Sequence, residues 1–139
     1  MNTQGAALRS GTPLHLATIL LVEDDESVHI LVRTMLLQQG YRVLCAEDSD
    51  EALEIAHRPG HHLDLLIADM VMPGMNGPQL AQRLRILQPN LPVLFMTGLI
   101  QEDIVPGTLL SEAGFLEKPF TPQALAAKVQ EVLAGSASK

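Results

Sequence analysis

The chain has few of the features that define several large classes of protein. Only one of its 139 residues is a cysteine, so Cys45 has no partner for a disulfide within the chain and a disulfide scaffold is excluded. Aromatic residues make up only 3% of the sequence. Because 47% of the residues are hydrophobic, aliphatic side chains must fill the core of a single domain of ordinary size.

Basic charge and long apolar runs are also scarce. The formal net charge is −7, which argues against non-specific binding to nucleic acid, because such binding needs a basic surface. No apolar run approaches the ~20 residues of a membrane helix. The first 18 residues are polar and lack the apolar core of a signal peptide. We therefore expect a soluble, cytoplasmic protein that binds neither nucleic acid nor membrane.

Short apolar runs alternate with amphipathic segments along the chain. The apolar runs have the composition of buried strands, and they lie at residues 19–22, 41–46, 63–69, 92–97 and 115–117. Between them, apolar residues recur at the helical spacing of three and four. In the first such segment they are Val28, Leu31, Val32, Met35 and Leu36, and in the third they are Leu80, Leu84 and Leu87.

Capping and breaking residues mark the ends of several expected helices. Ser49 is a plausible N-cap of the second helix, and Thr121 followed by Pro122 begins the last one, which Gly135 should end. A short fourth helix is expected in residues 101–111, but Pro106 and Gly107 interrupt it.

Five strands alternating with five helices predict an α/β fold with a parallel sheet covered on both faces. With right-handed crossovers this is a doubly wound, flavodoxin-like (βα)5 three-layer sandwich. We expect a flexible leader at residues 1–16, the domain at residues 17–135 and a short tail at residues 136–139.

Charged and polar residues stand where the expected strands end. They are Glu23, Asp24, Asp69, Thr97 and Lys118. In doubly wound sheets, ligands bind beyond the carboxyl ends of the strands, so these side chains should meet there. Two like charges 4 Å apart repel by about 4 kcal/mol at an effective dielectric of ~20, so the cluster is costly unless a cation joins it or one acid keeps its proton. Carboxylate oxygens together with a phosphoryl oxygen suit Mg²⁺.

Asp69 is the best candidate for a nucleophile. A carboxylate can attack phosphorus and form an aspartyl phosphate. The metal and Lys118 would neutralise charge on the transferring group, which is most of what phosphoryl transfer requires of a protein. Thr97 ends a strand, where its hydroxyl would donate to a phosphoryl oxygen.

Four segments together resemble the receiver domain of two-component response regulators. They are ILLVEDD at residues 19–25, LLIADMVMPGMNG at 65–77, VLFMT at 93–97 and KPFT at 118–121. They stand in the family's order and at its spacing, and the resemblance covers residues 17–135. The stretch at residues 101–114 and the segment KPFTPQAL at 118–125 look more like the receivers at the C-termini of hybrid histidine kinases.

The resemblance implies a metal site and a phosphoacceptor. Asp69 matches the phosphoacceptor, and Glu23 and Asp24 match the acidic pair that binds Mg²⁺. In this pair Asp24 would ligate the metal directly and Glu23 mainly through water. Val71 matches the position whose backbone carbonyl ligates Mg²⁺.

The resemblance also implies a conformational switch. Thr97 matches the switch hydroxyl, Phe115 the aromatic switch position, and Lys118 the lysine that pairs with the phosphoryl group. Phosphorylation would alter the face formed by the fourth helix, fifth strand and fifth helix. The implied partners are a sensor histidine kinase or histidine phosphotransfer protein, a downstream protein, and a second copy in a phosphorylation-linked homodimer.

Other interpretations remain open from the sequence. A metal-dependent phosphohydrolase with an aspartyl intermediate would require an acid two residues after the nucleophile, where Val71 stands. A pseudo-receiver that only binds a partner usually lacks one of the acidic or lysine positions. The histidines at 57, 61 and 62 are expected to be solvated, because their segment lies at the opposite edge of the sheet. The sequence alone leaves open whether the domain acts alone or comes from a hybrid kinase.

Overall fold

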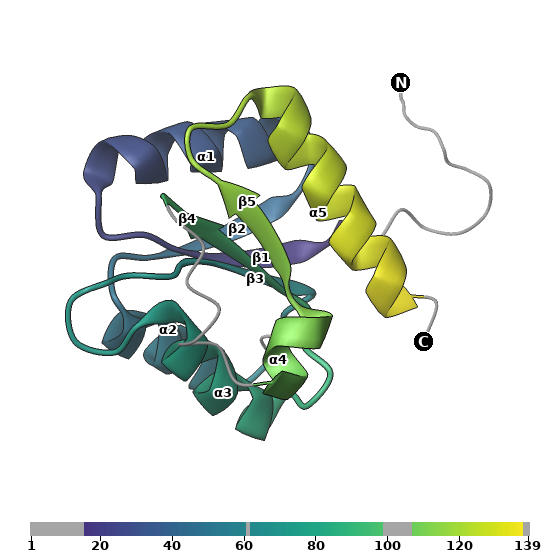
Figure 1. Ribbon diagram of the computed structural model, residues 1–139. Coiled ribbons are helices and arrows are strands. Elements are labelled where there is room, and N and C mark those ends of the chain that lie inside the picture. The colour runs from purple at the N-terminus through teal and green to yellow at the C-terminus, as the bar shows by residue number, and fades with distance from the viewer. Residues whose placement is uncertain (1–15, 61, 99–106, 138–139) are drawn as a thin grey trace.

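The computed structural model describes residues 16–60, 62–98 and 107–137 of the chain. Strands and helices alternate along it, as expected (Figure 1). Their bounds are β1 (Thr18–Val22), α1 (Glu26–Gln38), β2 (Arg42–Ala46), α2 (Ser49–His57), β3 (Leu65–Asp69), α3 (Gly77–Leu87), β4 (Val93–Thr97), α4 (Gly107–Glu112), β5 (Gly114–Glu117) and α5 (Pro122–Ala137).

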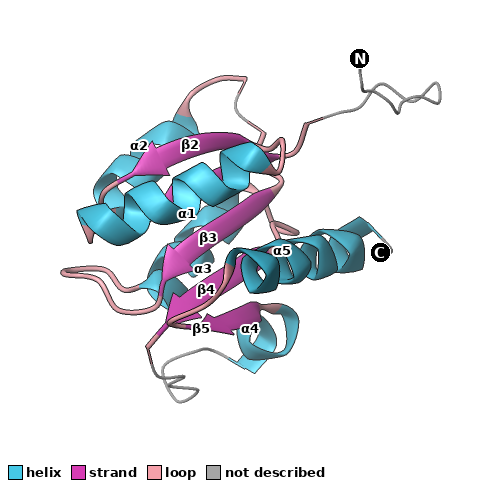
Figure 2. Cartoon of the chain, turned by 90° about the horizontal axis from the view of Figure 1, so that it is seen from above, coloured by secondary structure: helices cyan, strands magenta, loops and turns pink. Residues whose placement is uncertain are grey.

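The five strands form one parallel sheet in the order β2-β1-β3-β4-β5. Helices α1 and α5 cover one face, and α2, α3 and α4 cover the other, which Figures 1 and 2 show from two directions. Each face has its own buried apolar cluster, one around Leu66 and Phe95 and the other around Ile67 and Leu94. The predicted doubly wound α/β fold is therefore confirmed.

The start of α2 differs from the expectation that Ser49 caps it. Asp48 is the N-cap, because its backbone is extended and its side chain accepts a hydrogen bond from the Glu51 N–H at 2.8 Å. Ser49 is the first helical residue, and its hydroxyl points away from the helix end and donates to the Met75 carbonyl. The Ser49 cap was therefore wrong by one residue.

Two residues of the expected apolar stripes lie outside the core. Leu31 is 53% exposed and Leu87 is 46% exposed. In α1 the buried face is centred on Val32, Met35 and Leu36, so Leu31 lies beyond its border. Leu87 is the last residue of α3, and the buried face of this helix ends at Leu84.

Several element ends also differ from expectation. Helix α5 does not end at Gly135 but continues to Ala137. A glycine can adopt helical φ/ψ angles, and within a helix it lowers the stability without ending the helix. Helix α4 begins at Gly107, and residues 101–106 of the expected fourth helix lie outside the described part. Residues 1–15 of the expected leader also lie outside it. Within the described residues, no helix has the length and apolar character needed to cross a membrane.

The loop after β3 folds back onto the strand it leaves. The Gly77 N–H donates to the Met70 carbonyl at 3.0 Å, so the loop is closed at its base. A Cβ atom at position 77 would overlap the Asp69 carbonyl oxygen. Gly77 is therefore required by a close approach of α3 to the end of β3, and that approach fixes the backbone of Asp69.

The substitution Gly77→Ala is expected to lower the free energy of unfolding by about 1–3 kcal/mol, because backbone must shift to admit the methyl group. Urea denaturation measures this change. The matched control is Gly135→Ala in α5, where a Cβ meets no atom within 4 Å and should raise stability by about 0.5–1 kcal/mol. Equal effects of the two substitutions would contradict the close approach.

Candidate functional site

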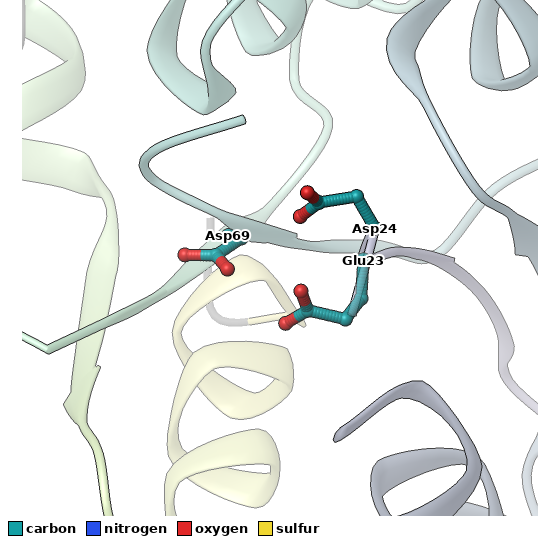
Figure 3. Close-up of side chains that lie close together, drawn as sticks. All are labelled: Glu23, Asp24 and Asp69. Carbon is teal, nitrogen blue, oxygen red and sulfur yellow. The ribbon is translucent and has the colours of Figure 1, made fainter. Parts of the chain in front are cut away.

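Three carboxylates meet at the carboxyl edge of the sheet. Glu23 and Asp24 directly follow β1, and Asp69 is the last residue of β3. The two strands are neighbours, with Val22 opposite Ala68. Oxygen atoms of the three carboxylates lie within 4.8 Å of one another, and Figure 3 shows the side chains turned toward one common space.

Lys118 brings a cation to this cluster from the other half of the sheet. It follows β5, and its backbone N–H donates to the Thr97 carbonyl at 2.7 Å. Its ammonium lies 2.9 Å from Asp69 Oδ2 and 3.2 Å from Glu23 Oε1. The lysine thus bridges Asp69 and Glu23, which come from different strands.

Burial divides the carboxylates into two kinds. The Glu23 side chain is fully buried, while Asp24 is exposed and the Asp69 side chain is 13% exposed. Burial, and to a smaller extent the negative charge of Asp69, raise the pKa of Glu23, which lies at about 7 when the opposing effects are included. The Asp25 N–H, which donates to Glu23 Oε2 at 3.0 Å, and the charge of Lys118 act in the opposite direction.

The pKa of Lys118 is raised above its usual value. Partial burial alone would lower it, but the hydrogen bonds and negative charges of Asp69 and Glu23 outweigh that cost. Lys118 therefore stays protonated, and the site keeps a fixed positive charge beside the Asp69 carboxylate.

The expected switch residues lie on the β4–β5 side of the site. Thr97 is the last residue of β4 and is buried, at 2% exposure. Phe115 in β5 is half-buried and stands opposite Phe95 in the register, with ring centroids 5.7 Å apart. Because side chains alternate along a strand, Phe95 and Thr97 point to the same face, so Phe115 lies on the face of the sheet that Thr97 occupies.

Val71 lies two residues beyond Asp69, in the loop between β3 and α3. Its side chain is 61% exposed, whereas the next residue, Met72, is buried. The apolar side chain of Val71 therefore faces solvent, two residues along the chain from Asp69.

The arrangement suits a hard divalent cation. Three clustered carboxylates offer oxygen ligands, and one ammonium does not balance their charge. Within the described residues, no other trio of acidic, histidine or cysteine side chains is so placed. Of the histidines at residues 57–62, His57 contacts the Leu53 carbonyl, His62 lies 3.7 Å from Asp64, and residue 61 lies outside the described part.

Sequence reasoning missed two contacts at the loop that follows Asp69. Ser49 was assigned to a helix end, and its link to the loop after Asp69 has no local signal, because the partner lies 26 residues away. Gly77 was part of a quoted motif, but its approach to Asp69 depends on how α3 packs.

Comparison with known protein families identifies the domain type. The family model described as "Response regulator receiver domain" matches residues 19–130. Among curated proteins, "Sensor kinase CckA" of Brucella abortus (strain 2308) is 40% identical over 119 residues, which cover 84% of this chain and 12% of that protein. The "Alkaline phosphatase synthesis transcriptional regulatory protein PhoP" of Bacillus subtilis (strain 168) is 34% identical, covering 83% of this chain and 48% of that protein.

Solved structures show the same fold over nearly the full length of each neighbour. A crystal structure of the receiver domain of the hybrid histidine kinase CckA has a TM-score of 0.70 and 37% identity, covering 84% of this chain and 99% of that one. The chemotaxis protein CheY4 of Vibrio cholerae has a TM-score of 0.77 and 31% identity, covering 85% and 99%. The chain thus matches whole receiver domains but spans at most about half the length of the first curated relatives it matches.

The raised pKa of Glu23 predicts that the metal-free protein loses stability as pH rises. Between the ordinary pKa of 4.5 and about 7, the folded state holds a proton that the unfolded chain has lost. The free energy of unfolding should therefore fall by on the order of 2 kcal/mol from pH 5 to pH 8. Lys118 adds no slope there, because its contribution is lost only above its ordinary pKa of 10.5.

Urea denaturation in the presence of a chelator measures this slope. In the matched variant Glu23→Gln the amide does not titrate, so the variant should lack that part of the slope. The same slope in both proteins would contradict the assignment of the proton to Glu23.

Replacing Lys118 by methionine should show whether the lysine ammonium competes with Mg²⁺ for the carboxylates. Removal of a cation 2.9 Å from Asp69 should destabilise the metal-free protein and raise its affinity for Mg²⁺ several-fold, because the ammonium and the metal compete for the same charge. Isothermal titration calorimetry measures the affinity. The matched control is Lys128→Met, which removes an ion pair with Glu131 on α5 and should leave Mg²⁺ binding unchanged. A weaker Mg²⁺ affinity in Lys118→Met would refute this competition.

Proposed function

Because the chain belongs to the response-regulator receiver family, we propose that it accepts a phosphoryl group from a phosphohistidine onto Asp69, with Mg²⁺ bound beside it. Receiver domains are signalling modules, and here the proposed chemistry is limited to the domain's own phosphorylation and dephosphorylation. One observation carries the proposal. A carboxylate at a strand end lies 2.9 Å from a lysine ammonium and beside two further carboxylates.

In the proposed step, one oxygen of the Asp69 carboxylate attacks phosphorus. The bond between phosphorus and the imidazole nitrogen of the donor breaks, and its electron pair stays on that nitrogen. The Lys118 ammonium, already at hydrogen-bond distance from Asp69, neutralises charge on the phosphoryl oxygens. The buried Thr97 at the end of β4 would donate its hydroxyl to one of these oxygens.

The donor set of the site fits Mg²⁺. Asp24 and Asp69 would ligate it directly together with the backbone carbonyl of Val71, and Glu23 would act mainly through water. When bound, the ion supplies positive charge that draws the phosphoryl group and the Asp69 carboxylate together. The exposure of Asp24 supports its role as the direct ligand, because a metal that keeps several waters needs an open side.

The signal would leave the site through β4 and β5. A phosphoryl group on Asp69 would draw the Thr97 hydroxyl inward, and the ring of Phe115 would fill the vacated space against Phe95. The change would reach the surface formed by α4, β5 and α5. A downstream protein or a second copy of the domain would read that surface.

The upstream partner would be a sensor histidine kinase or a histidine phosphotransfer protein, and the domain would act in the cytoplasm. The likeness to the receiver of a hybrid kinase supports a place in a phosphorelay. The resemblance to part of a transcriptional regulatory protein is compatible with a receiver that controls an output domain in a longer polypeptide.

Two alternative functions are less well supported. A phosphohydrolase of the aspartyl-phosphate type requires an acid two residues after the nucleophile, and here the exposed apolar side chain of Val71 stands at that place. A pseudo-receiver would not need the full set of acidic residues and lysine, which this chain brings together.

Phosphorylation provides the direct test. The protein is incubated with Mg²⁺ and acetyl phosphate, and intact-mass spectrometry should show one added phosphoryl group that does not form when Mg²⁺ is chelated beforehand. The matched control, Asp69→Asn, keeps the shape of the side chain but removes the nucleophilic carboxylate, so its labelling should fall by at least about 100-fold. Equal labelling of both proteins would refute the role of Asp69, and turnover of many phosphate esters would favour the hydrolase.

A further inference from the structure

Ser49 is a buried polar residue that the proposed chemistry does not use. Among the described residues, the buried polar or charged side chains are those of Glu23, Thr97 and Ser49, and the first two belong to the site. Ser49 is 4% exposed, and its hydroxyl donates to the Met75 carbonyl at 3.0 Å across 26 positions of sequence. A buried hydroxyl that is hydrogen-bonded to a distant loop requires an explanation beyond local structure.

Helix capping does not explain this hydroxyl. A serine at a helix start usually accepts a hydrogen bond from the first turn. In α2 that role belongs to Asp48, which accepts from the Glu51 N–H at 2.8 Å, while Glu51 accepts in return from the Glu47 N–H at 2.8 Å. The start of α2 is thus satisfied without Ser49, and the serine hydroxyl acts outside its own helix.

The hydrogen-bond partner of Ser49 belongs to the peptide group between Met75 and Asn76, and both polar atoms of this group are hydrogen-bonded. The carbonyl of Met75 accepts from Ser49, and the N–H of the same peptide group, on Asn76, donates to Gln79 Oε1 at 2.9 Å. One hydrogen bond comes from α2 and the other from α3. Together they fix the orientation of the peptide just before α3 begins.

This peptide ends the loop that starts at Asp69. The base of the loop is closed by the hydrogen bond from Gly77 to Met70 and by the contact of Gly77 with the Asp69 backbone. Within the loop, Met72 is buried and Val71 is exposed. The carbonyl of Val71 therefore lies between two held points, the end of β3 and the Met75–Asn76 peptide.

We propose that Ser49 is a positioning residue for the metal site, which holds the Met75 carbonyl and thereby sets the path of the loop that presents the Val71 carbonyl. The metal part of this inference rests on the proposed function. It assigns to α2, which contributes no ligand, a direct part in the geometry of the site.

The test compares Ser49→Ala with Asp48→Ala in the full chain. Ser49→Ala removes only the hydroxyl that reaches the loop, whereas Asp48→Ala removes the cap of the same helix and leaves that hydroxyl in place. Mg²⁺ affinity is measured by titration calorimetry at about 0.15 M salt, which weakens the effect of removing the exposed Asp48 charge. Amide hydrogen exchange of residues 70–77 is measured without metal.

Ser49→Ala should weaken Mg²⁺ binding about 3- to 10-fold, the factor that corresponds to one buried hydrogen bond, and should speed exchange in the loop. Asp48→Ala should lower the melting temperature but leave Mg²⁺ affinity within about twofold. These results would separate positioning of the loop from general loosening of α2, which a purely structural role would produce in both variants.

Unchanged loop exchange and Mg²⁺ affinity in Ser49→Ala would overturn the inference, as would an equal loss of affinity in both variants. Failure of the wild-type protein to bind Mg²⁺ would count against the proposed function instead. In that case faster loop exchange in Ser49→Ala, but not in Asp48→Ala, would still support the role of Ser49 in holding the loop, and equal exchange would refute it.

Discussion

The parallel register of the sheet is the constraint on which the site depends. Since β1 and β3 are direct neighbours, Glu23 and Asp69 emerge side by side, and their closeness contributes to the raised pKa of Glu23. The adjacent β4 and β5 then bring Thr97 and Lys118 to the same edge. Each face of the sheet is buried under a layer of helices, so charged groups can contact water at the carboxyl edge.

Charge is distributed unevenly within this edge. The fully buried Glu23 depends on a proton or on cations, while the exposed Asp24 keeps access to water. Lys118 reaches both Glu23 and Asp69, so one cation compensates two acids from different strands. One lysine compensates the three clustered acids only in part, and such a cluster could hold a divalent cation.

Much of the fold could be predicted from the sequence, because apolar runs and helical spacing are local signals. The fold class is confirmed, and the charged residues at the strand ends lie together as the topology required. Ser49 and Asp48 show where such reasoning ends. Both are good caps; Asp48 takes that role, and the Ser49 hydroxyl donates to the Met75 carbonyl in another loop, for which the sequence holds no local signal. The border of the α1 core face at Leu31 likewise depends on packing. The chemical roles of Asp69, Thr97, Phe115 and Lys118 remain predictions.

The ion pair between Lys118 and Glu23 joins residues 95 positions apart in the chain. A nascent polypeptide that ends before β5 already carries both acids but lacks the lysine that balances them. Electrostatic compensation of the acidic edge therefore arrives only when the last quarter of the domain has been synthesised and docked. The ion pair therefore forms only in a fully assembled domain, since a truncated or misassembled domain keeps an unbalanced acidic edge.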